Sequence, residues 1–345
     1  MQYLCTNLFF MQDSIVLDEI DLRIVHAMQV QPRAPWALIG SVVGVDPVTA
    51  ARRWRSLTDS GTAWIAAYPA ADAGSVLAFL DIRCEPRSRK RIVDELVAHA
   101  HVMSVNVHSG GCAVMAEALF VGTDALARYV LDDLQLQDGV TDVVVHPVTR
   151  VFTEGSRWRL GTLEPSGVRT LRESGVAPPL GRRHPLDRAT VAVIDVLGRR
   201  PRVSVTELAH ELEISTSTAR RRLGRALSQR TLLRCELARF ATGRPIRVLF
   251  TARIPVLDAE RAARILRART EIRLVASVAG SNNLFFAGWF RALPDLAALE
   301  ADLAVRAPTL EVVDRRVVLD TPKLMGHLLD RDGRSIGVVP VSVRT

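Results

Sequence analysis

An internal repeat limits what this chain can fold into more than any other feature of its sequence. Sliding the sequence along itself by 169 residues brings similar residues into register without a gap over the first part of each half, and further on the offset drifts only to 170 or 171. Self-similarity at a fixed offset indicates a repeated structural unit. The sequence therefore predicts one unit used twice through duplication and fusion; the alternative is a coincidental pair of unrelated α/β domains. The matched pairs include Leu17-Asp18 with Leu186-Asp187, Pro32-Arg33 with Pro201-Arg202, Arg52-Arg53 with Arg221-Arg222, Phe79 with Phe250, and Gly110 with Gly280.

The two halves are joined by a segment rich in proline and glycine. Residues 155–185 include Pro165 and the pair Pro178-Pro179, a composition that disfavours both helix and strand. The sequence leaves open whether Met1 or Met11 is the start. We expect the following parts: an N-terminal arm (1–14), a first helix-turn-helix head (15–66), a first sandwich domain (74–152), a linker (155–185), a second head (186–240), a second sandwich domain (245–322) and a C-terminal tail (323–345).

Composition favours an intracellular protein with an anionic partner. Lys and Arg number 45 against 37 Asp and Glu, which gives a net charge of +8, and such a balance favours association with nucleic acid. The apolar stretch 3–11 is about half as long as the roughly 20 residues needed to span a bilayer. The four cysteines lie far apart, the histidines lack metal-ligand spacing, and no phosphate-binding loop or catalytic carboxylate pair is evident. We therefore expect a cytoplasmic, nucleoid-associated protein with no membrane anchor, no metal, no cofactor and no catalytic residues.

Each half begins with three short predicted helices. Asp46 is a natural N-cap with Pro47 at the first helical position, and Ser215 occupies the corresponding place in the second half. Three short helices with a tight turn before the third are typical of a helix-turn-helix unit. The helices are expected at 17–30, 36–43 and 47–60, and at 186–197, 204–212 and from 215 onward.

The third helix of the second head is suited to the DNA major groove. Short hydroxyls in its first turn match base edges or phosphates, and successive arginines match the groove walls. The alternative is a solvated helix face in an arginine-rich protein. In the first head, Asp46-Pro47-Val48 and the bulky Trp54 weaken a groove-reading role and favour dimerisation or packing. The candidate DNA contacts are Ser215, Thr216, Ser217, Thr218, Arg220, Arg221, Arg222 and Arg225, with Thr49, Arg52, Arg53 and Arg55 in the first head.

The two heads differ in charge. Residues 17–64 carry five Arg against five acidic residues and are neutral, whereas residues 186–233 carry nine Arg against five and have a net charge of +4. Because each neutralised phosphate adds roughly one unit to the salt dependence of binding, the second head is expected to bind DNA more tightly.

After each head the pattern alternates strand, helix, strand, strand, helix, strand. That order predicts a ferredoxin-like βαββαβ sandwich, so the expected fold class is α+β with two tandem copies of a winged head and a sandwich. The segments are 76–82, 88–99, 102–108, 113–121, 125–134 and 140–148, and then 247–254, 258–269, 272–279, 284–290, 294–305 and 310–319.

From residue 15 to 320 the sequence resembles the Lrp/AsnC (feast/famine) transcriptional regulators. The resemblance is carried by Leu17, Asp18 and Asp21, by the hydroxyl-rich third helix and by the βαββαβ pattern typical of their ligand-sensing domain. It implies a sequence-specific regulator of double-stranded DNA, a built-in pseudo-dimer, and further assembly into dimers or tetramers.

The resemblance also implies a small amino-acid-like effector, bound at the interfaces near the loop between the second and third strands of each sandwich. The same glycines and asparagines equally suit tight turns with positive φ. In this sequence the loops supply Ser109, Gly110 and Gly111, and Gly280, Ser281, Asn282 and Asn283.

Two other functions stay open. The architecture also resembles the sirohaem decarboxylases, and residues 283–286 match part of their pattern, but residues 273–279 contain no His or Tyr and His108 lacks aromatic and Arg companions. A sensory protein that kept the fold and lost DNA binding is the third possibility. We expect a regulator and not an enzyme.

Overall fold

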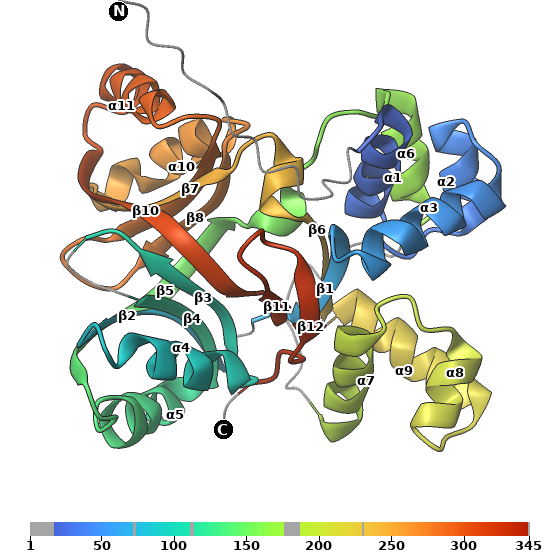
Figure 1. The fold of residues 1–345 in the computed structure, drawn as a ribbon, viewed down its shortest axis with the longest axis horizontal. Coiled ribbons are helices and arrows are strands. Elements are labelled where there is room, and N and C mark those ends of the chain that lie inside the picture. The colour runs from blue at the N-terminus through green and yellow to red at the C-terminus, as the bar shows by residue number, and fades with distance from the viewer. Residues whose placement is uncertain (1–16, 72–73, 111–113, 176–186, 230, 344–345) are drawn as a thin grey trace, which may run out of the picture.

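The computed structural model describes residues 17–71, 74–110, 114–175, 187–229 and 231–343. The predicted N-terminal arm, Gly111 and the end of the predicted linker lie outside these residues. Two helical heads lie side by side on one flank of the molecule, and the strands form the other (Figure 1).

The first head consists of three helices whose ends lie within two residues of the predicted ones. Asp18 and Asp21 form a capping box at the start of the first, and Asp46 caps the third through the Val48 and Thr49 amides. Gly44 ends the second helix with a φ of 85°, in the left-handed region that favours glycine. The helices are α1 (Glu19–Val30), α2 (Trp36–Val43) and α3 (Pro47–Asp59).

The second head repeats this arrangement. Asp187 caps its first helix, Ser204 and Glu207 form a capping box on the second, and the Ser215 hydroxyl accepts from the Thr218 amide at the start of the third. The helices are α7 (Arg188–Arg199), α8 (Val205–Glu211) and α9 (Thr216–Gln229).

A two-stranded antiparallel ribbon joins the heads. Strand β1 (Ala63–Pro69) follows the first head and pairs with β6 (Thr231–Leu237), which follows the second. Cys235 and Leu237 from β6 enter the core of the first head, and Ala67 from β1 enters the core of the second. Each head buries residues from the other half's strand, so the ribbon contributes to the apolar cores of both heads. Neither strand was identified from the sequence.

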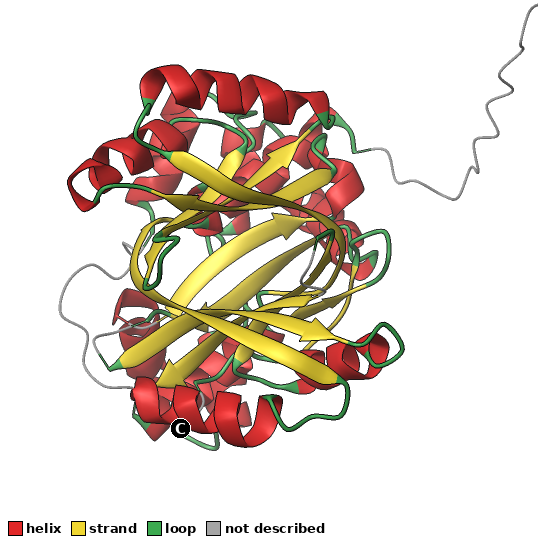
Figure 2. Cartoon of the chain, turned by 90° about the vertical axis from the view of Figure 1, so that its left-hand side faces the viewer, coloured by secondary structure: helices red, strands yellow, loops and turns green. Residues whose placement is uncertain are grey.

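The remaining elements form two βαββαβ units. Within the units the strands follow the orders β3-β4-β2-β5 and β8-β9-β7-β10. Strand β5 also pairs with β8 and β10 with β3, so the eight strands close into one antiparallel ring, with helices packed on its outside (Figure 2). The elements are β2 (Ser75–Cys84), α4 (Arg89–Ala98), β3 (Val102–His108), β4 (Val114–Val121), α5 (Gly122–Arg128) with a π-helical turn (Tyr129–Leu134), and β5 (Val140–Thr153), then β7 (Ile246–Arg253), α10 (Ala259–Arg267), β8 (Ile272–Val278), β9 (Leu284–Phe290), α11 (Pro294–Arg306) and β10 (Glu311–Leu324).

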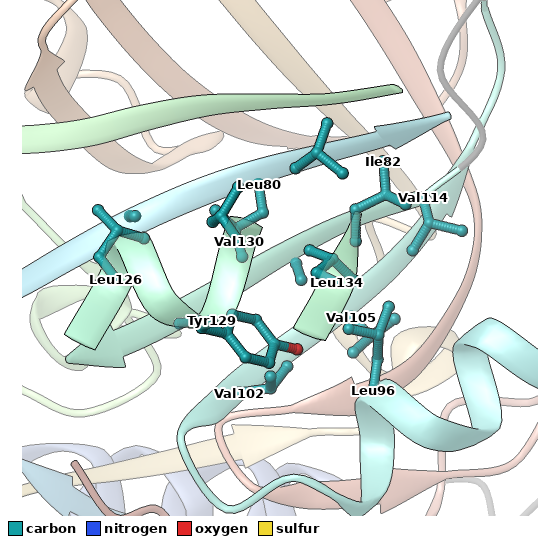
Figure 3. Packing of buried hydrophobic residues seen from close by; sticks show 14 of the residues in the cluster. Leu80, Ile82, Leu96, Val102, Val105, Val114, Leu126, Tyr129, Val130 and Leu134 are labelled. Atoms are coloured by element: carbon teal, nitrogen blue, oxygen red, sulfur yellow. The ribbon is translucent and has the colours of Figure 1, made fainter. Parts of the chain in front are cut away.

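Each unit has its own apolar core between its sheet and its helices. In the first unit Leu80 and Val105 from the sheet pack with Leu96 from α4 and Tyr129 from the π-helical turn (Figure 3). A third cluster, which includes Phe79 and Phe285 with ring centroids 4.3 Å apart, fills part of the space inside the ring.

The linker contains regular structure, contrary to the sequence prediction. Helix α6 (Pro165–Glu173) begins with proline at its first turn, where the missing amide is not needed, and Leu171 packs into the first head. The preceding residues dock on α1, because His26 Nδ1 accepts from the Thr162 and Leu163 amides at 3.0 and 2.9 Å. Burial lowers the pKa of His26 to about 4, so it stays neutral as the acceptor requires.

The C-terminal segment is also structured, so the predicted boundary at 322/323 divides a strand. Strand β10 continues to Leu324, and a hairpin follows it as β11 (His327–Leu329) and β12 (Ser335–Val338). The hairpin packs under the ribbon, where the backbone of Ser335 meets Gly61, a residue with a φ of 65° and no room for a Cβ. Among the described residues, no helix is long and apolar enough to cross a membrane.

Candidate nucleic-acid interface

Helix α9 presents the polar face that the sequence predicts. Thr216, Ser217, Arg220 and Arg221 are exposed, whereas Ala219 is fully buried against the head. The hydroxyls of Ser215, Ser217 and Thr218 form a local network, with Ser215 Oγ 2.9 Å from Thr218 Oγ1. The outer face of α9 therefore offers guanidinium and hydroxyl donors together.

Several arginines that contribute to the net charge of the second head form ion pairs with carboxylates of that same head. Arg199 and Arg200 pair with Glu211 on α8. Arg225, at the far end of α9, lies 3.7 Å from Asp187. Arg220 and Arg221 form no ion pair with any described residue, so the free positive charge is concentrated at the beginning of α9.

In the first head, one of the candidate DNA contacts is held inside the domain. Arg53 Nη1 lies 2.7 Å from Asp18 and 2.9 Å from Asp21, the two residues of the α1 capping box. Hydrogen bonds from Arg53 to these carboxylates raise its pKa above its usual value. Arg52 and Arg55 are exposed, and Thr49 is half-buried. Thus α3 offers two outward arginines, and Arg53 ties α3 to α1.

Two arginines that the sequence analysis treated as repeat markers and as part of the net charge connect the heads to each other. Arg33 donates to the carbonyls of Pro201 and Val203, the latter at 2.7 Å, and Arg202 donates to the carbonyls of Pro32 and Ala34, the latter at 2.8 Å. Each guanidinium thus grips the two carbonyls that flank the other arginine. We call this reciprocal arrangement the arginine clasp.

The clasp is partly buried. The Arg202 guanidinium also stacks over Trp36 at 4.3 Å. Burial, with a smaller contribution from the charge of Arg33, lowers the pKa of Arg202 to about 10. Since the clasp and the ribbon both connect the heads, α3 and α9 are held in a fixed relation.

The loops proposed to bind an effector contain tight turns with backbone contacts. Gly110 and Gly280 have φ values of 105° and 139°. Ser109 exchanges hydrogen bonds with the backbone of Val317 on β10. Asn283 accepts from the Ile254 amide at 3.0 Å and donates to the Ile254 carbonyl at 2.9 Å. Asn283 therefore joins its loop to the end of β7, and Gly111 lies outside the described residues.

Two buried polar groups inside the ring were missed from the sequence. In one, Asp81 accepts from Arg316 at 2.6 Å and lies 3.2 Å from His146 Nε2. His108 lies close enough for the charge of Arg316 to reinforce burial in lowering its pKa. Arg316 belongs to the other half of the chain, so sequence proximity could not indicate its influence on His108.

The second group lies toward the ribbon and centres on Arg247 and Arg273. Both are nearly inaccessible, with exposures of 7% and 4%. Arginine at two strand positions flanked by apolar residues was a signal that could have identified them.

Comparison with known proteins gives one match to a family model and several to related chains. The model of the AsnC-type helix-turn-helix domain matches residues 17–58. An uncharacterised helix-turn-helix transcriptional regulator of Pyrococcus horikoshii is 24% identical over 147 residues, which cover 42% of this chain and 90% of that protein. The solved sirohaem decarboxylase NirDL is similar with a TM-score of 0.57 at 12% identity, covering 93% of this chain and 95% of its own. A Neisseria meningitidis transcriptional regulator solved with L-Met is 22% identical over 39% of this chain and 91% of its own, with a TM-score of 0.35.

These findings define the class first: the chain carries an AsnC-type helix-turn-helix domain, the DNA-binding unit of transcriptional regulators. In that domain, and over the residues matched by its regulator homologue, the chain is similar to the Lrp/AsnC regulators, as the sequence predicts. The likeness to the decarboxylase, at 12% identity, is a likeness of fold.

Proposed function

We propose that this protein is a sequence-specific transcriptional regulator, made of two tandem head-and-sandwich copies, that reads the major groove mainly with α9. The observation that carries the proposal is the beginning of α9, where exposed Arg220 and Arg221 lie beside the exposed hydroxyls of Thr216 and Ser217. Guanidinium groups supply affinity for phosphate and bidentate contacts to guanine, and short hydroxyls fit either bases or phosphates.

The first head is proposed to position the second. Arg53 of this head forms ion pairs with Asp18 and Asp21. The first turn of α3 presents Val48, which is 76% exposed, at the place where α9 presents hydroxyl groups. Arg52 and Arg55 supply phosphate contacts in this proposal. Because the arginine clasp fixes the two heads, one chain would present one strong and one weak reader to an asymmetric operator.

The test is the salt dependence of DNA binding. The operator is first identified by chromatin pull-down sequencing of the tagged full-length protein. The R220A/R221A double variant should then lower the slope of log affinity against log salt by about two, because it removes two phosphate-competent charges. The matched control is R52A/R55A, which removes two exposed arginines from α3 and should change affinity less.

Two results would reject the proposal. If the two double variants weaken binding equally, α9 is not the principal reader. If the wild-type protein enriches no DNA, and the R220A/R221A variant gives the same pull-down pattern, the chain is a sensory module without DNA binding.

Assembly and effector binding are further parts of the proposal. Val256 and Leu257 are 81% and 97% exposed at the edge of the second sandwich, which supports association of chains into dimers or tetramers in the cytoplasm. Light scattering of the purified protein tests this. An amino-acid-like effector near Gly110 and Gly280 would be detected as a shift in operator affinity.

A second candidate, a sirohaem-decarboxylase-like enzyme, is favoured by one observation. The His108, Asp81 and Arg316 group gives the interior of the ring acid–base groups, within a fold similar to that of NirDL over 93% of the chain. Mixing the purified protein with sirohaem should leave its Soret band unshifted if the regulator proposal holds. A saturable shift that is lost in H108A would favour the enzyme.

A further inference from the structure

Three side chains on adjacent strands form a buried cationic group beneath the ribbon. Arg247 on β7 and Trp289 on β9 are register partners, and Arg273 is at the start of the neighbouring β8. The guanidinium carbons of Arg273 and Arg247 lie 4.5 and 4.8 Å from the centre of the Trp289 ring. Trp158 covers Arg273 on another side at 3.6 Å.

Part of the hydrogen-bonding capacity of these two arginines is unused. Arg247 donates to Asn106 Oδ1 at 2.6 Å, but its Nε has no acceptor among the described residues. The Nε and Nη2 of Arg273 likewise have none within that part of the chain. Because the aromatic rings cover the faces of the Arg273 guanidinium, its donors point outward along the edge of the group.

The carboxylates nearby are engaged by other groups. Glu236 forms an ion pair with Arg234, and Glu154 accepts from the Tyr68 hydroxyl. Burial raises the pKa of Glu117 on β4, and the charge of Glu117 only partly offsets the effect of burial on the pKa of Arg247. Burial lowers the pKa of Arg273 to about 9. No carboxylate of the described residues is hydrogen-bonded to this guanidinium to offset the effect. Among the described residues, the group therefore holds positive charge that lacks a directly bound anion.

A small cavity of about 40 Å³ lies against this group. Its wall includes Arg247, Arg273, Trp64, Trp289 and Thr242. Since a single water needs roughly 10–15 Å³, the space holds about three waters or one small anion. Three carboxylates also line it, and each has a partner in the fold. Glu236 is paired with Arg234, Asp320 accepts from the Thr321 amide, and Asp330 accepts from the amides of Asp332 and Arg334.

The corresponding place in the first half shows that the fold does not require these charges. Arg247 and Trp289 occupy the same position of the β7–β9 ladder as Leu77 and Leu119 occupy in the β2–β4 ladder. This register makes Phe79 equivalent to Leu249, so the match of Phe79 with Phe250 in the sequence was off by one residue. Met103, the second residue of β3, takes the position of Arg273 in β8. Leu77, Leu119 and Met103 pack into an apolar cluster. Buried charges usually stabilise a fold no better than apolar residues of similar size, so a purely structural role does not explain Arg247 and Arg273.

We propose that this cavity binds a small carboxylate anion, held by the free guanidinium edges of Arg273 and Arg247 with its short apolar part against Trp64 and Trp289. A carboxylate matches the planar fork of arginine and the size of the space. The site is separate from the loop at residues 280–283, which follows the opposite end of β8, about 20 Å along the strand. It does not depend on DNA binding.

The test is direct binding to the purified full-length protein. Acetate and pyruvate are titrated at constant ionic strength, with chloride and inorganic phosphate as separate arms, and binding is followed by calorimetry and by tryptophan fluorescence. We expect saturable binding of at least one carboxylate, with a fluorescence change because Trp158 and Trp289 contact Arg273.

The principal variant is R273M, which gives the second half the methionine that the first half has at the equivalent position, Met103. It should weaken carboxylate binding at least tenfold and leave the unfolding temperature unchanged or higher. The exposed Arg291 lies outside the cavity, so R291M is the matched control and should bind as the wild type does. If R273M does not fold, R247L, which copies Leu77 of the first half, takes its place.

Three outcomes overturn the proposal. The first is no saturable binding of either carboxylate by the wild-type protein. The second is equal binding by R273M, or by R247L where it is used, and the wild type. The third is binding of phosphate or chloride without binding of carboxylates.

Discussion

Replacing Arg202 by methionine should loosen both heads at once, because the arginine clasp is reciprocal. The substitution removes two hydrogen bonds from a charged donor to carbonyls, each worth about 1.5–3 kcal/mol, and a stacking contact with Trp36 worth about 0.5–1 kcal/mol. The cost of burying the Arg202 guanidinium opposes the stabilisation from these contacts. A pKa lowered from 12.5 to about 10 corresponds to roughly 3 kcal/mol. The net loss expected from R202M is about 2 kcal/mol, the middle of a range of about 0.5–4 kcal/mol.

Native-state hydrogen exchange measures this loss locally. A change of about 2 kcal/mol increases the opening equilibrium roughly 30-fold, and we expect it in the amides of both α2 and α8. Arg188 is an exposed arginine of the second head, and R188M should change exchange by less than about threefold. If R202M leaves exchange in α2 at the wild-type rate, the clasp does not hold the heads together and the reasoning fails.

Three other outcomes are expected. The pKa of His26 is lowered from 6.5 to about 4, so its neutral form stabilises the fold. That stabilisation, up to about 3 kcal/mol, should be lost as pH falls from 6.5 through 4. The free energy of unfolding measured in urea should depend less on pH over this range in H26Q. N283A should destabilise the second sandwich by about 1–3 kcal/mol in thermal unfolding, because the Ile254 backbone loses both partners, and a change of effector response without destabilisation would contradict this structural role. R53M should leave operator affinity within about twofold while lowering stability by about 1 kcal/mol or less, since its charge is spent on Asp21 and the rest of the capping box; a large loss of affinity would restore Arg53 as a DNA contact.

The helices and strands could be predicted because local signals and tertiary packing agree for them. Asp18, Asp46 and Ser215 occupy cap positions that specify where a helix starts, and apolar periodicity marks its buried face. Ser75–Cys84 and Leu284–Phe290 are strands in the structure, and their β-forming composition indicated this. In these segments a few neighbouring residues carry the whole signal.

Segments stabilised by distant partners could not be predicted in this way. Helix α6 forms in a stretch rich in glycine and proline because Leu171 packs into the apolar core of the first head. The C-terminal hairpin is held by pairing with β10 and by the contact between Ser335 and Gly61. Apart from the pairing of β10 with β11, these contacts join positions more than a hundred residues apart, which periodicity does not record.

The candidate interface was predictable in outline, and its details were not. Counting charges predicted a basic face on α9, but it counted Arg199, Arg200 and Arg202 equally with Arg220, although the first three have partners in the fold. Only the structure distinguishes an arginine that holds a domain together from one that is free to bind.

The inequality of the two halves therefore extends beyond the heads. At equivalent positions of the ladders, the first half has Leu77 and Leu119, which pack, and the second has Arg247 and Trp289, where the arginine leaves a donor unused beside a cavity. A fold that is stable with the apolar version gains nothing in stability from the charged one, so the charged version requires another cause. If that cause is a bound anion, R273M gives up binding and keeps or gains stability. If the charges served the fold alone, R273M would instead destabilise the protein and leave carboxylate binding where it was.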